Sequence, residues 1–314
     1  MTVLGHLVAL IFAAFAALLP VASVDYKAPL SSVHIQPHLP AQAGVTVLFG
    51  GDVMFDRTIR TTVLEKGGDF IFSCIDSTLR GSDLVVANLE GPITPHVSVS
   101  ATSTPGDEFN YTFTFPPSTA ALLAAHNIRV VNIGNNHIYN FGTDGVRSTI
   151  AALTDAHVGY FGDPLSASVA AGSFNGVPLA FINYNEFVNH GEASTTLAQI
   201  HSARAAGEVP VVYTHWGIEY ATTSPAYVHT LAHEFIDAGA EIVIGSHPHV
   251  VEEHELYSGK NVYYSLGNFI FDQYWNNNVA HGLLLQVTFT SAGVQSVKEI
   301  PVELEHDRRT CPVE

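Results

Sequence analysis

Residues 45–54 read VTVLFGGDVM. A run of apolar and β-branched residues, Val45 to Phe49, ends at the pair Gly50-Gly51, and this pattern predicts a short buried strand closed by a turn. Asp52 follows the glycines directly. A lone aspartate at such a position is most often a turn residue or a helix cap. Whether Asp52 is a functional residue therefore depends on whether other predicted strands are also followed by polar residues.

Strands and helices alternate over the first two thirds of the chain. Further apolar runs predict strands at Asp83–Ala87, Ile128–Ile133, Leu179–Tyr184, Val209–Thr214 and Glu241–Gly245. Segments with helical spacing of apolar residues predict helices at Phe70–Leu79, Ser118–His126, Asp144–Ala156, Thr196–Ala205 and Pro225–Ala238. Thr143 is the expected N-cap of the third of these helices.

The last third of the chain changes to strands alone. They are expected at Val250–Leu256, Val262–Ser265, Gly282–Phe289 and Val297–Glu303. Strand-helix units followed by antiparallel strands predict an α/β fold in which sheets are flanked by helices. We expect one domain over residues 45–305 and a C-terminal tail over residues 306–314.

Composition and charge exclude several classes of protein. The 314 residues are 47% hydrophobic and 13% charged, which excludes a disordered chain, a collagen and a disulfide mini-protein. Asp and Glu outnumber Lys and Arg by 29 to 12, so the formal net charge is −17. Such a chain repels nucleic acids and anionic membranes, and we expect neither as a partner. An anionic substrate would need a local cation.

The amino-terminal segment predicts export. Leu7 to Leu19 is an uncharged apolar run of 13 residues, too short to span a membrane and suited to the core of a signal peptide. Val21-Ala22-Ser23 supplies the small residues of a cleavage site, so we expect a signal peptide over residues 1–23, a leader over 24–44 and a secreted mature protein without stable membrane insertion. No Lys or Arg precedes the apolar run, which is unusual for a signal peptide. The alternative is therefore an uncleaved membrane anchor.

Two cysteines and one sequon bear on an extracytoplasmic location. Cys74 and Cys311 either form one bridge, as an oxidising compartment allows, or remain two thiols, because spacing alone does not show whether they meet. Asn110-Tyr111-Thr112 fits the N-glycosylation sequon, which matters only in a eukaryotic host.

Polar residues follow five of the predicted strands. These strand-end groups are Asp52, Asn88 to Glu90, Asn135 to His137, His215 to Glu219, and Ser246 to His249. Ligands of α/β sheets bind beyond the carboxyl ends of the strands, and this mixture of nitrogen and oxygen donors suits Zn²⁺, Mn²⁺ or Fe²⁺. Each group alone has a simpler interpretation, such as a turn asparagine or a half-buried histidine, but their recurrence at strand ends favours a metal site.

The same groups carry a resemblance to a known family. The ordered blocks are Gly51-Asp52-Val53-Met54, Asn88-Leu89-Glu90-Gly91, Asn135-Asn136-His137, His215-Trp216-Gly217-Ile218-Glu219, Ser246-His247-Pro248-His249 and Tyr264-Ser265-Leu266-Gly267-Asn268-Phe269. They resemble the capsule-synthesis, or poly-γ-glutamate synthesis (CapA-type), family, which is related to the calcineurin-like metallophosphoesterases. The resemblance implies a four-layer αββα sandwich and a centre of one or two divalent ions.

The resemblance also implies roles for individual residues. Asp52 and His249 would hold a first metal, Asn136, His215 and His247 a second, and Glu90 would lie between them. His137 falls at the position of the general acid. Two departures weaken the first site: Met54 stands where the phosphoesterases have a histidine, and Glu90 replaces a bridging aspartate. The first site is then weak, absent, or rebuilt from Asn88 or Glu219.

These residues predict a metal-dependent hydrolase that acts on an anionic ester or amide. Glu219 is a candidate base or extra ligand, with a solvated surface carboxylate as the alternative. Asn88, Trp216 and Asn268 are candidate substrate-binding residues. The family role in capsule synthesis makes poly-γ-glutamate a candidate partner. Two alternatives remain open: a non-catalytic polymer-binding scaffold, and a hydrolase of γ-glutamyl amides.

Overall fold

The computed structural model describes residues 44–188 and 192–313. The predicted signal peptide and nearly all of the predicted leader lie outside these residues. Among the described helices, none is long and apolar enough to cross a membrane. The described residues belong to a single compact unit.

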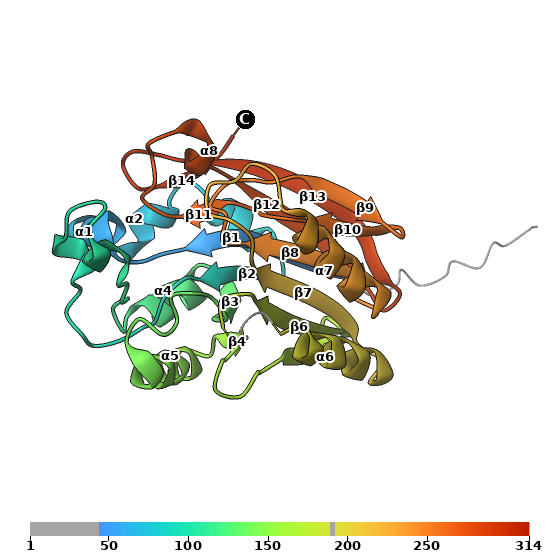
Figure 1. Ribbon diagram of the computed structural model, residues 1–314. Helices are drawn as coiled ribbons and strands as arrows, with labels where there is room; N and C mark the ends of the chain where they lie inside the picture. The colour runs from blue at the N-terminus through green and yellow to red at the C-terminus, as the bar shows by residue number, and fades with distance from the viewer. Residues whose placement is uncertain (1–43, 189–191, 314) are drawn as a thin grey trace, which may run out of the picture. The chain divides into compact units, whose positions relative to one another are not determined.

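The larger sheet contains eight strands (Figure 1). Its order is β14-β13-β12-β1-β2-β3-β4, and β11 pairs with β1 off this path. The strands are β1 (Val45–Val53), β2 (Leu84–Leu89), β3 (Ile128–Asn132), β4 (Gly159–Phe161), β11 (Asn268–Ile270), β12 (His281–Thr290), β13 (Gly293–Leu304) and β14 (Thr310–Pro312). β1 to β4 are mutually parallel, whereas β12, β13 and β14 join them as antiparallel strands.

The smaller sheet has six strands in the order β5-β6-β7-β8-β10-β9. They are β5 (Ala170–Phe174), β6 (Val177–Asn185), β7 (Val209–His215), β8 (Ile242–Ser246), β9 (His254–Tyr257) and β10 (Lys260–Tyr263). The central strands β6, β7, β8 and β10 are parallel.

Three apolar clusters show that the sheets and helices form four layers. The middle cluster joins the two sheets face to face through residues such as Phe49, Val86, Phe181 and Tyr213. A second cluster packs helices on the larger sheet: α1 (Arg57–Lys66), α2 (Gly68–Phe72), α3 (Asp76–Arg80), α4 (Thr119–Ala125) and α5 (Gly142–Asp155). A third packs α6 (Ser194–Ala205) and α7 (Ala226–Asp237) on the smaller sheet. The expected αββα sandwich is confirmed.

Short helical turns complete the fold and correct several predicted boundaries. They are η1 (Ser100–Thr102), η2 (Glu108–Tyr111) and α8 (Asn277–Ala280). The helix predicted over 70–79 is divided into α2 and α3 by a turn, and Thr143 lies inside α5, which begins after Phe141. The strand predicted over 250–256 is reduced to β9, because residues 247–253 form the loop that leaves the smaller sheet.

The turn predicted at Gly50-Gly51 is instead strand, and β1 runs on to Val53. β1 continues because it pairs with β2 on one side and with β11 on the other. Gly51 allows this close approach: a Cβ at this position would lie 1.9 Å from the carbonyl oxygen of Gly267. Asp52 is therefore held inside a strand rather than on a flexible turn.

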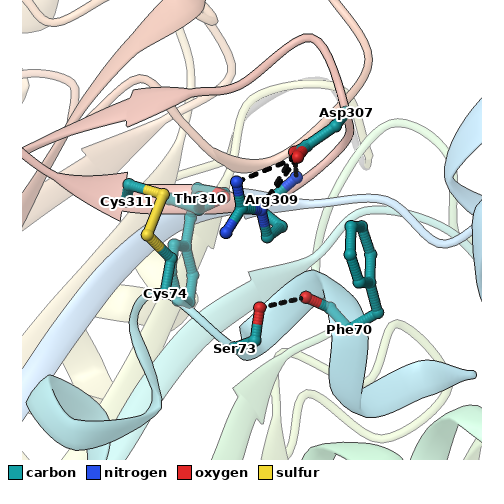
Figure 2. The surroundings of a disulfide bond; sticks show 8 residues. Phe70, Ser73, Cys74, Asp307, Arg309, Thr310 and Cys311 are labelled. Atoms are coloured by element: carbon teal, nitrogen blue, oxygen red, sulfur yellow. Dashed lines mark hydrogen bonds and ion pairs between the residues drawn. A yellow bond between two sulfur atoms is a disulfide. The ribbon is translucent and has the colours of Figure 1, made fainter.

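The larger sheet continues past residue 305 through β14. Within the segment 306–314, β14 pairs with β13, and Cys311 of β14 forms a disulfide with Cys74 between α2 and α3 (Figure 2). Beside the bridge, Arg309 forms an ion pair with Asp307 and lies over the ring of Phe70. Of the two alternatives for the cysteines, the structure contains the bridge.

The sequon asparagine is buried. Asn110 is 6% exposed, its amide oxygen accepts from Arg57, and its amide nitrogen donates to Ser103. In the folded protein this side chain is not accessible for glycosylation.

Candidate metal centre

The predicted ligands come from the strand ends of two stacked sheets. Asp52 lies in β1, Glu90 follows β2, and Asn136 follows β3 in the larger sheet; His215 ends β7, and His247 and His249 follow β8 in the smaller one. The ends meet because both sets of strands are parallel and the sheets pack face to face, so their carboxyl ends lie on the same side.

Three of these side chains form a tight buried group. Asp52, Glu90 and His249 each offer a ligand atom within 4.8 Å of the others. Nδ1 of His249 lies 3.3 Å from Oδ2 of Asp52, and Nε2 lies 3.5 Å from Oε1 of Glu90. All three side chains are almost fully buried. Oxygen and imidazole donors at these separations are a set that a divalent cation accepts.

Glu90 is the member of this group that most requires a cation. It is fully buried, and neither carboxylate oxygen has a hydrogen-bond partner among the described residues. Burial, followed by the negative charge of Asp52, raises the pKa of Glu90 well above its usual range. A buried carboxylate without donors is costly. A bound divalent ion would supply the missing interactions and hold the group ionised.

The hydrogen bonds of Asn268 fix the tautomer of His249. The Asn268 amide nitrogen donates to Gln273 Oε1 and to the Val279 carbonyl, so its oxygen faces Nδ1 of His249 at 3.0 Å. Nδ1 therefore carries the proton, and Nε2 presents its lone pair toward Glu90. The predicted substrate-binding residue Asn268 is thus a positioning residue for a candidate ligand.

Asp52 and Asn88 are joined to each other. Asn88 donates from its amide nitrogen to Oδ1 of Asp52 at 2.7 Å, and the backbone N–H of His247 donates to Oδ2 at 3.2 Å. The amide oxygen of Asn88 accepts from Asn132 and Asn135. Because its polar atoms are engaged by the protein, Asn88 orients Asp52 in this structure.

A second group forms around His215 and Asn136. The hydroxyl of Ser246 donates to the Thr214 carbonyl and lies 2.9 Å from Nδ1 of His215. The amide nitrogen of Asn88 also lies 3.3 Å from Nδ1 of His215 and can only donate, and Nε2 of His215 lies 3.0 Å from the amide oxygen of Asn136. Without metal, Nε2–H donates to Asn136. An imidazole nitrogen and an amide oxygen this close together are also donors that one cation could share in place of that proton.

His247 adjoins the second group. Its ring centroid is 4.8 Å from that of His215, and its Nδ1 is buried without a hydrogen-bond partner among the described residues. Burial and the nearby His249 lower the pKa of His247 to about 3, and burial lowers that of His215 well below its usual range. Both imidazoles are neutral at neutral pH, which is the state that binds metals.

The loop that carries His247 and His249 has an unusual backbone. The φ angles of these two residues are 100° and 60°, a region that side chains other than glycine rarely adopt. Such conformations cost on the order of 1–3 kcal/mol each and cluster at functional sites. The strained loop brings the ring of His249 to Asp52 and Glu90 of the larger sheet and the ring of His247 to His215 of the smaller sheet.

The predicted residues His137 and Glu219 lie outside the group of Asp52, Glu90 and His249. Nε2 of His137 is 3.8 Å from Oε1 of Glu90, and Nδ1 donates to Asn140 at 3.1 Å. Burial and then the charge of His249 lower the pKa of His137 to about 4. Glu219 is exposed, and its charge contributes to the raised pKa of Glu90.

Trp216, a predicted substrate-binding residue, and Met54, the departure from the phosphoesterase pattern, both belong to the core. Trp216 is fully buried and its indole N–H donates to the Tyr264 carbonyl, so it stands behind the site instead of lining it. Met54 is also fully buried, and its sulfur accepts from the backbone N–H of Asp56. It provides no ligand at the position where the phosphoesterases have a histidine.

Residues outside the predicted set complete the surroundings. Asn135 donates to Asn88 and to the Leu89 carbonyl, and Gln273 anchors Asn268. The Asn135-Asn136 pair in the sequence is a signal that could have identified Asn135. For Gln273 the sequence carries no signal, because its contact depends on how the loop after β11 folds back.

A scan against family models matches the chain to "Bacterial capsule synthesis protein PGA_cap" over residues 46–273. Among curated proteins, the PGA biosynthesis protein CapA of Bacillus subtilis (strain 168) is 29% identical over 283 residues, which cover 84% of this chain and 73% of that protein. The capsule biosynthesis protein CapA of Bacillus anthracis is 27% identical over 282 residues, 83% of this chain and 68% of that protein.

Solved structures include a more distant likeness. The crystal structure of TT1561 of Thermus thermophilus aligns with 81% of this chain and 97% of that chain, with a TM-score of 0.44 and 11% sequence identity.

Proposed function

This chain belongs to the bacterial capsule synthesis family PGA_cap, and from this premise we propose that it is a secreted accessory protein of poly-γ-glutamate synthesis that acts as a metal-dependent hydrolase. Its substrate in this proposal is an anionic ester or amide. Relatives named for PGA and capsule biosynthesis support the biological role.

The unpartnered carboxylate of Glu90 carries the proposal. It is fully buried beside Asp52 and His249, and the described residues offer it no hydrogen-bond donor. A buried carboxylate without a partner destabilises the fold. Glu90 differs from Glu252, the other carboxyl of this kind among the described residues, because it lies beside Asp52 and His249. A cation held by Glu90, Asp52 and His249 would give the Glu90 carboxylate its missing partner. His215, Asn136 and His247 are the candidates for a second ion.

A bound divalent ion would supply Lewis acidity and a water of lowered pKa. The residues of the chain would do the rest. Asn268 and Asn88 hold His249 and Asp52 in fixed orientations. His137 is neutral at neutral pH, with Nδ1 donating to Asn140. Its Nε2 is therefore free to accept a proton from the attacking water. It then returns that proton to the leaving group, which is the general-acid role that the family resemblance implies.

The test combines metal content with turnover. Purified protein should contain metal, measured by elemental analysis, and should hydrolyse p-nitrophenyl phosphates or γ-glutamyl anilides when Mn²⁺ or Zn²⁺ is added. The two substrates separate an esterase from an amide hydrolase. His247→Ala and Asp52→Ala should abolish turnover, and the exposed His201→Ala is the matched control. Full turnover in the site variants would refute the proposal.

A non-catalytic polymer-binding scaffold is the second candidate, and Met54 favours it. The thioether of Met54 is packed in the core and leaves the first site one ligand short of the phosphoesterase pattern. The scaffold alternative predicts a metal-free protein that binds poly-γ-glutamate with the same affinity before and after treatment with a chelator.

A further inference from the structure

A cleft of about 290 Å³ opens beside the candidate metal centre. Its walls come from the start of α1, the segment around η1 and η2, the loop after β11, and the turn before β14. We call it the arginine cleft, after Arg57 and Arg308, and its other named members are Asp272, Tyr220, Gln273 and Trp275. None of these residues belongs to the candidate ligand set.

The arginine cleft and the metal centre share a wall. The ring of Tyr220 lies 5.9 Å from the ring of His249, and its hydroxyl accepts from the amide of Gln273. Gln273 in turn accepts from Asn268, which positions His249. A substrate whose scissile bond reaches His249 and Glu90 would therefore extend along Tyr220 into the cleft.

Charge distinguishes this cleft from the rest of an acidic molecule. Its charged members are two arginines and one aspartate, which sum to one positive charge, whereas the whole chain carries −17. Asp272 is neutralised within the protein, because it accepts from Arg57 Nη2 at 2.5 Å and from the backbone N–H and hydroxyl of Thr58.

Of the two arginines that line the cleft, Arg57 is paired with Asp272 and Arg308 has no carboxylate partner among the described residues. Its Nε donates to the hydroxyl of Thr58 at 2.8 Å, Nη1 donates to the carbonyl of His306, and its guanidinium lies over the ring of Tyr274. Among the described residues, no carboxylate lies within 4.0 Å of it, although seven other Lys and Arg residues have such a partner. An arginine fixed by neutral contacts is prepared to receive an external anion.

Exposed aromatic rings border the same cleft. Trp275 is 59% exposed, and its ring contacts that of Tyr220 at 5.3 Å between centroids. Tyr111 also lines the cleft and is 47% exposed. Rings in this position would cover the methylene groups of a bound chain, while Arg308 binds its charge.

We propose that the arginine cleft binds a carboxylate of the substrate, one residue or more away from the bond at the metal centre, with Arg308 as the anchor. The net charge of one matches a monoanionic carboxylate better than a dianionic phosphate. The inference rests on the proposed function for the reaction itself, but the binding it predicts takes place without metal. Arg308 is a specificity-determining residue in this scheme and takes no part in the chemistry.

The experiment measures binding to the metal-free full-length protein. The probes are a trimer of γ-linked glutamate and its uncharged counterpart, in which carboxamides replace the carboxylates. Trp275 is exposed and the other tryptophan, Trp216, is buried, so quenching of tryptophan fluorescence reports the cleft, and calorimetry checks the affinity. We expect the acidic trimer to bind, its affinity to fall with salt, and the uncharged trimer to bind at least about tenfold more weakly.

Variants of Arg308 test whether this residue binds the carboxylate. Arg308→Gln should weaken binding of the acidic trimer about tenfold or more, and Arg308→Lys should restore part of the loss. Arg147→Gln, on the exposed face of α5, is the matched control and should bind as the unmodified protein does. Equal binding of the two trimers, or unchanged binding by Arg308→Gln, would overturn the inference. The trimer comparison uses the unmodified protein, so it decides the matter even if the variant fails to fold.

Activity separates this inference from the function on which it rests. If the metal-loaded protein hydrolyses an acidic substrate and Arg308→Gln leaves KM unchanged, the cleft assignment is wrong and the hydrolase stands. If Arg308-dependent binding is found but no substrate is hydrolysed, the hydrolase is wrong and the binding site stands.

Discussion

Oε1 of Glu90 lies 3.5 Å from Nε2 of His249, although the two residues leave different sheets. No hydrogen bond joins them, because Nδ1 of His249 carries the ring proton toward Asn268. Each of the two sheets thus contributes one lone-pair donor to the same buried position. The predictions below for metal binding and proton transfer depend on this arrangement.

Glu90→Gln should separate metal binding from stability. The raised pKa of Glu90 means that the metal-free fold resists ionising this group, so the variant should be at least as stable as the unmodified protein above neutral pH when both are metal-free. Metal at about 100 times its Kd should raise the Tm of the unmodified protein by about 5 °C and that of Glu90→Gln by less. Differential scanning calorimetry with Mn²⁺ or Zn²⁺ measures both effects. The control is Glu65→Gln on exposed α1, and a metal response in Glu90→Gln equal to the control's would contradict the assignment.

His137→Ala should lose turnover and keep its metal. A residue that accepts and returns a proton contributes about 10²–10⁴-fold to kcat, so we expect a loss of that size. Because His137 is not among the candidate ligands, metal content by elemental analysis should be unchanged. His201→Ala is the exposed control. Loss of metal together with activity would instead identify His137 as a ligand.

Glu252 should make the stability of the fold depend on pH. It is 7% exposed, its carboxylate oxygens have no partner among the described residues, and burial raises its pKa to about 8. The folded state therefore binds a proton that the unfolded state releases near pH 4.5, so stability falls as pH rises from about 5 to 8. Urea unfolding of the unmodified protein should lose up to about 4 kcal/mol over this range relative to Glu252→Gln. If the free energy of unfolding depended on pH in the same way for both proteins, the pKa of Glu252 would not be raised in the folded state and the prediction would be wrong.

Removal of the bridge between Cys74 and Cys311 should destabilise the fold. The two residues are 237 positions apart, so the bridge closes nearly the whole described chain. We expect Cys74→Ala together with Cys311→Ala to lower the free energy of unfolding by about 2–5 kcal/mol, with β14 as the first segment to exchange its amide hydrogens. Denaturant unfolding and hydrogen exchange measure these effects. The oxidised protein treated with a reductant should reproduce the double variant, and a difference between them would indicate packing effects of the substitutions.

The alternation of elements could be predicted because most strands and helices bury an apolar face of regular period. The predicted strands at Val209 and Glu241 and the predicted helix at Pro225 agree with the structure within one or two residues for this reason. β11 and β14 are three residues long and gain their structure from pairing, so their own residues carry too little pattern. The sequence does not predict α1, because the faces of this helix mix threonine, arginine and glutamate.

The sequence predicts a set of candidate site residues but not their geometry. Strand-end positions identified Asp52, Glu90, His215, His247 and His249, and the structure brings them to the meeting edges of the two sheets. Spacing could not show that Asn88 and Asn268 bond to these side chains rather than to a ligand, because that depends on which lone pairs their neighbours leave free. It also could not show that Trp216 packs behind the site, where its ring stacks with Phe235 and Tyr264.

The link between residue 74 and residue 311 has a consequence for how the molecule responds to proteolysis. A protease that cuts once at any exposed loop between these positions, such as the turn at Asn175-Gly176, leaves both fragments covalently joined. The pieces stay at high mutual concentration, and the two sheets retain each other through their shared apolar interface. A nicked molecule would migrate as one species until reductant is added, and its strand-end cluster would survive the cut.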